Sequence, residues 1–100
     1  MLRPEGIHKY YIYILTNINK TVLYTGVTNN LKRRLIEHAE GKSKFTSRYN
    51  VKYLLYYECF GWIDEAITRE KEIKGWSRKK KEQLINNLNS EWEFLNHLFE

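Results

Sequence analysis

The chain has 100 residues, of which 42% are hydrophobic and 15% are aromatic. This composition suits one packed core, and the length is too short for two ordinary domains, so we expect a single domain over residues 1–100. No apolar run approaches the roughly 20 residues of a membrane span, and the N-terminus lacks a signal-peptide block, so we expect a cytoplasmic protein without a membrane partner. Because Cys59 is the only cysteine, a disulfide framework and a cysteine-rich zinc site are excluded.

The formal net charge is +5, and the positive charge is concentrated in two segments. Residues 32–52 carry seven Lys and Arg against two acids, and residues 69–81 carry the same numbers. Clustered positive charge is typical of proteins that bind a phosphate backbone. An excess of this size also occurs on proteins that bind nothing charged, so charge alone does not decide the function.

The first half of the chain predicts a β-hairpin followed by a helix. Residues 9–15 and 21–27 are rich in aromatic and branched side chains, with turn formers between them, and we expect the second strand to end at Gly26. Helix-capping residues and apolar positions at helical spacing then predict a helix over residues 30–40, which Gly41 ends.

The second half predicts one strand and several helices. Residues 42–50 are polar and basic and suit a surface loop. The near-continuous apolar run over residues 52–60 has the length and composition of a central strand that is buried on both faces. Helical patterns fill the rest, over residues 62–74, over residues 77–88 and from Ser90, where Glu93 completes a capping box.

A carboxylate falls on the expected core face of the helix over residues 62–74. Glu70 lies within a helical stripe that comprises Ile63, Ala66, Ile67, Ile73 and Lys74. One interpretation is a glutamate at the edge of the stripe, paired with Lys74 one turn later, which is the commoner arrangement on an arbitrary helix. The other is a metal ligand, because a lone hard oxygen ligand suits Mg²⁺ held largely by water and substrate phosphates.

Arg34 and His38 raise a similar question in the helix over residues 30–40. They are one turn apart, about 6 Å along the axis, and can converge on one anion. The alternative is a solvated arginine beside a core histidine. Tyr13 and Tyr24 lie on the two hairpin strands, but the chain has eight tyrosines, so packed aromatic rings are the default interpretation for either one.

The order and spacing of these residues are more specific than any single motif. The set resembles the GIY-YIG nuclease superfamily over about residues 9–92, and it comprises Tyr11-Ile12-Tyr13, Tyr24-Thr25-Gly26 after ten intervening residues, Arg34, His38 and Glu70. The basic segment over residues 75–81 is similar to that of small stand-alone, UPF0213-like members related to the N-terminal nuclease domain of the UvrC repair enzyme.

The resemblance implies an α/β (α+β) fold with a small three-stranded antiparallel sheet flanked by helices. It also implies hydrolysis of a DNA phosphodiester with one divalent metal, Mg²⁺ or Mn²⁺, and no small-molecule cofactor. The family's functional positions map individually onto the motif tyrosines Tyr13 and Tyr24, the motif arginine Arg34, the His or Tyr position His38, the metal-binding glutamate Glu70 and, more weakly, a late asparagine, Asn89.

These residue types suit phosphodiester hydrolysis. The site must deprotonate water, neutralise charge on the phosphoryl oxygens and stabilise the departing 3′ oxyanion. A metal on Glu70 would do the last two. We assign Tyr24 as general base, which requires the metal and Arg34 to ease loss of its hydroxyl proton. Arg34 would clamp phosphate, while Tyr13 and His38 would position the attacking water or relay a proton to it.

The sequence therefore favours a metal-dependent DNA endonuclease that is structure-selective or weakly sequence-specific. The leading alternative is a nucleic-acid-binding module that keeps the scaffold without useful turnover, since Val27 stands where many active members carry a lysine.

Cations at residues 78–81 oppose the helix dipole, so we expect their removal to leave the melting temperature unchanged or higher. The expected DNA contacts are Lys32, Arg33, Lys44, Arg48, Arg78, Lys79, Lys80 and Lys81.

Overall fold

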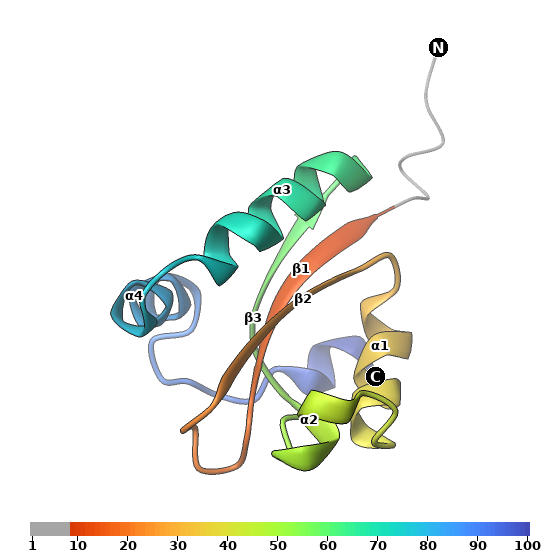
Figure 1. The fold of residues 1–100 in the computed structure, drawn as a ribbon, viewed down its shortest axis with the longest axis vertical. Coiled ribbons are helices and arrows are strands. Elements are labelled where there is room, and N and C mark those ends of the chain that lie inside the picture. Colours follow the sequence, from red (N-terminus) through yellow and green to blue (C-terminus); the bar gives the residue numbers. More distant parts are fainter. Residues whose placement is uncertain (1–8) are drawn as a thin grey trace.

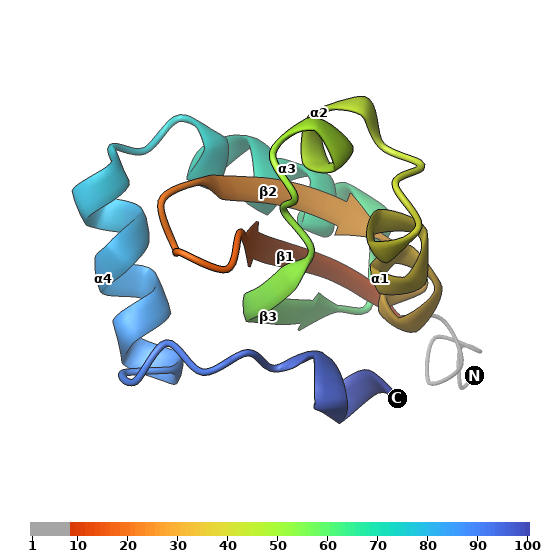
Figure 2. The same ribbon diagram turned by 90° about the horizontal axis from the view of Figure 1, so that it is seen from below.

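The computed structural model describes residues 9–100. Three antiparallel strands form one sheet in the order β2-β1-β3, with bounds Tyr10–Thr16 for β1, Leu23–Thr28 for β2 and Tyr53–Phe60 for β3. This confirms the expected sheet. The expectation of a central strand over residues 52–60 is wrong, because β1 lies in the centre and β3 is at the edge of the sheet (Figure 2).

Helices cover both faces of the sheet. They are α1 (Leu31–Ala39), α2 (Lys44–Arg48), α3 (Ile63–Lys74), α4 (Arg78–Leu88) and a final 3₁₀ turn, η2 (Asn96–Phe99). Figure 1 shows α3 and α4 on one side of the sheet and α1, α2 and η2 on the other. No helix within residues 9–100 is long and apolar enough to cross a bilayer.

The alternation of side chains along β1 divides the core into two clusters, because successive strand residues point to opposite faces. Ile12 and Ile14 pack towards α3 and α4, in a cluster with Ala66 and Ile73. Tyr13 and Leu15 pack on the opposite face, in a cluster completed by Leu31, Leu35, Val51 and Leu54. Tyr13 therefore lies on the α1 side of the sheet.

Local capping explains where two of the helices begin. The Asn30 side chain accepts a hydrogen bond from the Arg33 backbone N–H at the start of α1, and the Ser77 hydroxyl accepts one from the Lys80 N–H at the start of α4. The expected bounds of both helices are confirmed to within one residue.

The structure corrects two local expectations. Residues 42–50 are not a plain loop, because they contain α2. No helix begins at Ser90, because the Asn89 side chain accepts from the Glu93 N–H and Trp92 has φ 52°. The chain instead runs along β3, where the Leu95 N–H donates to the Leu54 carbonyl at 2.8 Å (Figure 2).

The stripe expected on α3 is narrower than the sequence indicated. The buried positions are Ala66, Glu70 and Ile73. Ile63 and Ile67 are exposed instead, because the helix turns only one side toward β1 and β2. The carboxylate of Glu70 is therefore part of the buried side of α3.

Candidate active site

A hydrogen-bonded chain of side chains links β1, α1 and α2 inside the protein. The Tyr13 hydroxyl lies 3.3 Å from Arg34 Nε and 2.9 Å from His38 Nε2. His38 Nδ1 lies 2.8 Å from Thr46 Oγ1, which in turn donates to the Ser43 carbonyl at 3.4 Å. The structure thus brings together three residues that the sequence could only associate by spacing.

The residues at the two ends of this series of hydrogen bonds, Arg34 and Thr46, determine where each proton lies. Arg34 can only donate to Tyr13, and Thr46 donates to a carbonyl, so His38 carries its proton on Nδ1 and donates it to Thr46. Nε2 of His38 then accepts from the Tyr13 hydroxyl. Every donor between Arg34 and Ser43 has an acceptor in this arrangement.

The electrostatics of the cluster keep Tyr13 and His38 uncharged. Burial raises the pKa of Tyr13 to about 12, against a smaller lowering by the hydrogen bond from Arg34. Burial, aided by the positive charge of Arg34, lowers the pKa of His38 to about 4. Both side chains are almost completely buried. At neutral pH they form a neutral hydrogen-bonded pair beneath the guanidinium of Arg34.

Arg34 is held at two of its three nitrogens. Nε donates to Tyr13, and Nη1 donates to the Glu37 carboxylate at 3.1 Å. Burial works against its charge, but these two hydrogen bonds outweigh it and raise the pKa of the guanidinium above its usual range. Nη2 makes no hydrogen bond with residues 9–100, and the side chain is 31% exposed. A fixed guanidinium with one open edge is suited to a phosphate oxygen.

Tyr24 lies beside this chain on the edge strand β2. Its ring centroid is 6.3 Å from Tyr13, 5.5 Å from His38 and 5.8 Å from Phe45. Tyr24 is partly buried, and within residues 9–100 its hydroxyl forms no hydrogen bond. Its ring is therefore held by neighbours while its oxygen stays available to a ligand.

Gly26 provides the space in which the Tyr13 ring lies. The two residues are cross-strand partners, and a Cβ atom built on Gly26 would lie 2.4 Å from the Tyr13 hydroxyl oxygen. Carbon and oxygen cannot approach so closely, so a side chain here would displace the hydroxyl that bonds to Arg34 and His38. The glycine of the second motif thus has a steric role in this fold.

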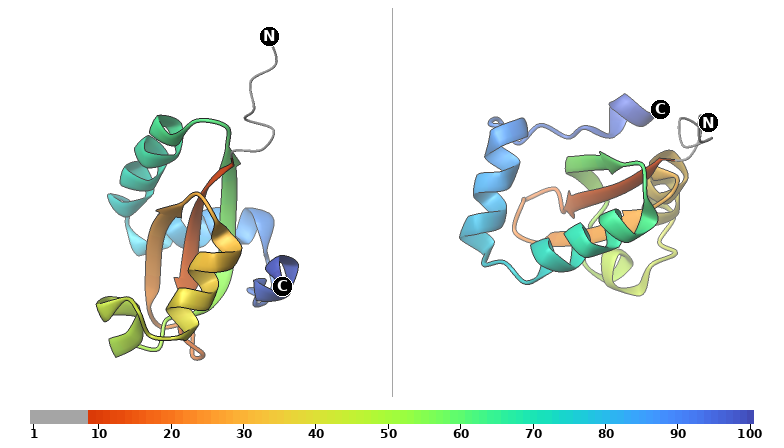
Figure 3. Two further views of the ribbon diagram at one scale, coloured as in Figure 1. Left: turned by 90° about the vertical axis from the view of Figure 1, so that its right-hand side faces the viewer. Right: turned by 90° about the horizontal axis from the view of Figure 1, so that it is seen from above.

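Glu70 is separate from the tyrosine cluster. It is a residue of α3, which packs against β1 and β2 on the face of the sheet opposite α1 (Figure 3). Tyr13 belongs to the cluster on the α1 face. Its side chain is 12% exposed and pairs with Lys74 Nζ at 2.8 Å, while the Lys74 side chain is 54% exposed. The structure confirms the ion pair that the sequence offered as one interpretation.

The carboxylate of Glu70 could hold a metal only as a single protein ligand. Residues 9–100 contain no group of three or more His, Cys, Asp or Glu placed to bind an ion together. One hard carboxylate fits Mg²⁺ or Mn²⁺ that keeps most of its water and also binds a phosphate. It does not fit a fully protein-coordinated ion such as structural Zn²⁺. Lys74 would have to move aside, which its exposed side chain allows.

The expected DNA-binding cations divide into two groups. Arg78 is used by the fold, because it donates to the carbonyls of Thr21 and Lys20 at 2.7 and 2.9 Å and pairs with Glu82. These bonds attach α4 to the hairpin loop. We therefore no longer expect the melting temperature to stay unchanged when Arg78 is replaced. The remaining cations are exposed or partly exposed, and they are Lys32, Arg33, Lys44, Arg48, Lys79, Lys80 and Lys81.

Asn89 has a structural position. It is 7% exposed, and its amide donates to the carbonyls of Leu55 and Glu93 while its oxygen accepts from the Glu93 N–H. These bonds attach the segment after α4 to β3. They occupy the whole side chain, and we give Asn89 no part in the site.

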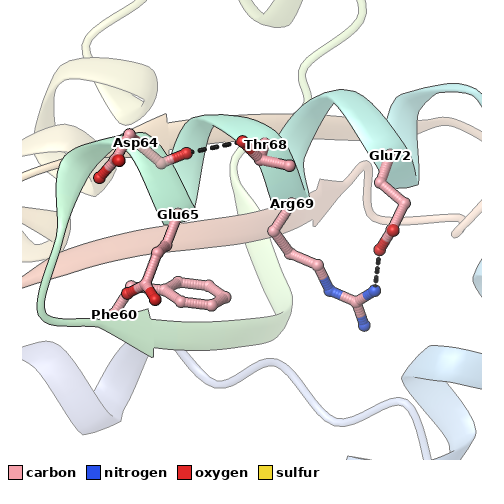
Figure 4. A pocket seen from close by; sticks show the side chains of 6 residues that line it. All are labelled: Phe60, Asp64, Glu65, Thr68, Arg69 and Glu72. Carbon is pink, nitrogen blue, oxygen red and sulfur yellow. Dashed lines mark hydrogen bonds and ion pairs between the residues drawn. The ribbon is translucent and has the colours of Figure 1, made fainter.

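A pocket of about 360 Å³ lies between α3 and the end of β3 (Figure 4). It is lined by Phe60, Asp64, Glu65, Thr68, Arg69 and Glu72. Arg69 pairs with Glu72 and forms two hydrogen bonds, at 2.9 and 3.0 Å, with Glu58 of β3. This pocket is thus bordered by the ion pairs that attach α3 to the sheet.

Sequence reasoning missed Thr46 and Glu37 as partners of the candidate residues. Thr46 lies in a five-residue helix, which is too short for an apolar period. Glu37 could have been found, because a carboxylate three residues after Arg34 on a helix is a recognisable pairing signal.

The fold and this cluster together define the class of protein. It is a small α+β domain in which a tyrosine hydroxyl, an arginine and a neutral histidine meet beside an edge strand, as expected for a GIY-YIG type of nuclease. The model of the GIY-YIG catalytic domain matches residues 9–83. The chain belongs to this family, which implies an endonuclease-type function on nucleic acid.

Relatives of similar length support the same assignment. A UPF0213 protein of Bacillus pumilus is 39% identical over 87 residues, covering 86% of this chain and 88% of the relative. A UPF0213 protein of Haloquadratum walsbyi is 40% identical and covers 75% of this chain and 84% of the relative. The solution NMR structure of a UPF0213 protein of Bacillus halodurans has a TM-score of 0.56 and 36% identity, and covers 89% of this chain and 93% of that chain.

Proposed function

We propose that the protein is a metal-dependent DNA endonuclease, structure-selective or weakly sequence-specific, which hydrolyses phosphodiester bonds. The observation that carries the proposal is the position of Arg34 and Tyr24. Both are held by Tyr13 or His38, and each leaves a polar atom open within the described part of the chain. Both side chains are partly exposed, so these atoms lie at the surface end of a buried network, where a phosphate and a water molecule can reach them.

Tyr24 is the general base in this proposal. Its hydroxyl oxygen is the group beside the cluster that remains free for the attacking water, and its ring cannot swing away because three neighbouring rings contact it. Base catalysis by a positioned side chain contributes about 10²- to 10⁴-fold to a rate. Tyr24 would supply this contribution.

Arg34 stabilises charge on the phosphoryl group. Its Nη2 is open, while Tyr13 and Glu37 fix the plane of the guanidinium. A donor that is fixed before the substrate arrives needs no reorganisation when charge develops in the transition state.

Tyr13 and His38 act as positioning residues. The sequence predicted that they position the attacking water or relay a proton to it, but both are almost fully buried and neutral. Tyr13 holds Arg34 and donates its own proton to His38. A cavity of about 160 Å³ between α1 and α2, lined by His38 and Thr46 among others, adjoins this pair.

Glu70 is the ligand that we assign to Mg²⁺ or Mn²⁺, with water and a substrate phosphate completing the coordination. Since α3 packs on the face of the sheet opposite Tyr13, the proposal requires the DNA backbone to cross the β2 edge, with Arg34 on one side of it and the metal on the other. The metal would neutralise phosphoryl charge and stabilise the departing 3′ oxyanion. The buried Glu70 carboxylate needs a positive charge beside it, and a metal ion could take that place. Lys74 supplies that positive charge when the metal is absent.

The substrate test uses plasmid, single-stranded, flap and branched DNA with Mg²⁺, Mn²⁺ or EDTA. We expect cleavage of at least one substrate with either metal and none with EDTA. Tyr24→Phe removes one hydroxyl and should lower the rate about 10²-fold or more while the melting temperature holds. Tyr10→Phe is the matched control, since Tyr10 faces the other cluster. Equal rates for both variants would refute the role of Tyr24.

A second candidate function is a nucleic-acid-binding module without turnover. The observation that favours it is Val27, whose side chain packs against the cluster of Ile12 and Ile14 at the position where many active members carry a lysine. This alternative predicts DNA binding that is the same with Mg²⁺ and with EDTA, and no cleavage of any of the four substrates.

A further inference from the structure

Two exposed aromatic rings extend the site along α2. Phe45 is 45% exposed and Tyr49, the residue that caps the end of α2, is 44% exposed. The Phe45 ring stacks on Tyr24 with an interplanar angle of 27°, and its centroid is 5.0 Å from that of Tyr49. The three rings form a row that leads from the candidate base to the protein surface.

The row is placed by a buried contact. Thr46 is the buried residue of α2, and its hydroxyl accepts from His38 at 2.8 Å. Because Phe45 precedes Thr46 directly, the bond that anchors α2 to His38 also sets Phe45 against Tyr24. The exposed rings therefore have a fixed position relative to Arg34 and the phosphate that it would bind.

The charge around these rings indicates what covers them. Residues 41–52 contain four Lys and Arg and no acid. Lys44 and Arg48 are four residues apart, and so are Phe45 and Tyr49, so α2 carries a cationic stripe next to an aromatic one. The Arg48 guanidinium lies 5.6 Å from the centre of the Tyr49 ring. The surface is complementary to a partner with both negative charges and flat rings.

A nucleic-acid strand has these two properties, but only if its bases are unpaired. In a duplex the face of each base is covered by its neighbours in the stack, and a protein ring can reach only the base edges. In a single strand or a splayed junction the base faces are free to stack on aromatic side chains, while cations track the phosphates.

We propose that Phe45 and Tyr49 form a stacking platform for unpaired bases next to the phosphate bound at Arg34. Lys44 and Arg48 contact the phosphates of the same strand. The protein thus selects DNA in which the nucleotides beside the cleaved bond are unpaired. This inference rests on the proposed function, because it places the platform beside that site.

The test measures DNA binding in EDTA, so that no cleavage is needed. Fluorescence anisotropy gives Kd for a labelled 12-nucleotide strand and for the duplex of the same sequence. Phe45→Ala and Tyr49→Ala should each weaken binding of the single strand by about 5- to 150-fold, the range for loss of one stacked base. Binding of the duplex should change by less than about twofold. Tyr49→Phe keeps the ring and should bind like the unaltered protein.

A second measurement distinguishes stacking from a plain apolar contact. Phe45→Leu keeps apolar volume without a flat ring, and we expect it to bind the single strand as weakly as Phe45→Ala. Strands with one abasic position should lose less affinity with Tyr49→Ala than with the unaltered protein, because the variant has one stacking ring fewer. Tyr49 does not contact Tyr24, so its variants remain informative if Phe45→Ala loosens the fold, which circular dichroism would reveal.

Three results would overturn the inference. In the first, the variants weaken binding of the strand and of the duplex equally. In the second, Phe45→Leu binds the single strand with full affinity. In the third, the unaltered protein binds anionic phospholipid vesicles, and Tyr49→Ala loses that binding while its DNA affinity is unchanged. Failure of the proposed function looks different, since cleavage would be absent while binding of the single strand still depended on the rings.

Discussion

Protonation of His38 should destabilise the protein as the pH falls. In the folded chain the imidazole is neutral, with its pKa lowered to about 4 by burial and by Arg34. In the unfolded chain its pKa returns to about 6.5. Above pH 6.5 the ring is neutral in both states and pH has no effect through His38. Between pH 6.5 and 4 only the unfolded state takes up the proton, so stability decreases as the pH falls.

The size of the effect follows from the two pKa values. Linkage predicts a loss of about 1 kcal/mol in the free energy of unfolding by pH 5.5, and of about 2 to 3 kcal/mol by pH 4.5. This is a large fraction of the 5–15 kcal/mol that typically stabilises a domain. The loss should be complete near pH 4, where the folded state also takes up the proton.

Urea unfolding of the unaltered protein and of His38→Gln, at pH 7.5, 6.5, 5.5 and 4.5, checks this prediction. Glutamine can accept from Tyr13 through its side-chain oxygen but does not titrate. The difference in free energy between the two proteins should shrink by about 2 to 3 kcal/mol from pH 7.5 to pH 4.5. Other titrating groups cancel in this difference. A difference that stays constant would show that His38 has an ordinary pKa and is not buried as described.

Two further predictions concern the sheet and α4. Gly26→Ala should destabilise the protein by about 1 to 3 kcal/mol, because its Cβ would collide with Tyr13, whereas Gly61→Ala, whose Cβ would meet no atom within 4 Å, should melt like the unaltered protein. Replacing Lys79 and Lys81 by Gln should reduce the slope of the logarithm of the DNA-binding constant against the logarithm of salt concentration by about 2, since each lost phosphate contact contributes about 0.9. The melting temperature should not fall, and an unchanged slope would place the DNA away from α4.

Local signals predicted most of the fold. The N-caps Asn30 and Ser77 and the helical spacing that follows each gave α1 and α4 to within one residue. The edge position of β3 follows from the predicted hairpin, because a third strand can pair only at an edge of two strands that already pair with each other. The segment after α4, which packs along β3 through Leu95 and Leu54, was not predictable. Contacts between residues so distant in sequence have no local pattern.

The candidate site was also only partly predictable from the sequence. The spacing of the set pointed to Tyr13, Arg34 and His38 as one cluster, and the hydrogen bonds now join them. The sequence could not reveal that Tyr13 and His38 are buried beneath Arg34. This depends on α2 folding back so that Thr46 reaches His38.

The central claim is that the protein hydrolyses DNA with a metal on Glu70, and Glu70→Gln tests it. The variant removes the charge and keeps the shape of the side chain. Glu65→Gln, on the exposed side of the same helix, is the matched control. Both variants are first compared for melting temperature and for DNA affinity in EDTA, which we expect to remain close to those of the unaltered protein.

The measurement is the rate of DNA cleavage over a range of Mg²⁺ and Mn²⁺ concentrations. We predict that Glu70→Gln abolishes cleavage at every metal concentration while Glu65→Gln cleaves like the unaltered protein. Cleavage by Glu70→Gln at the rate of the unaltered protein would contradict the account.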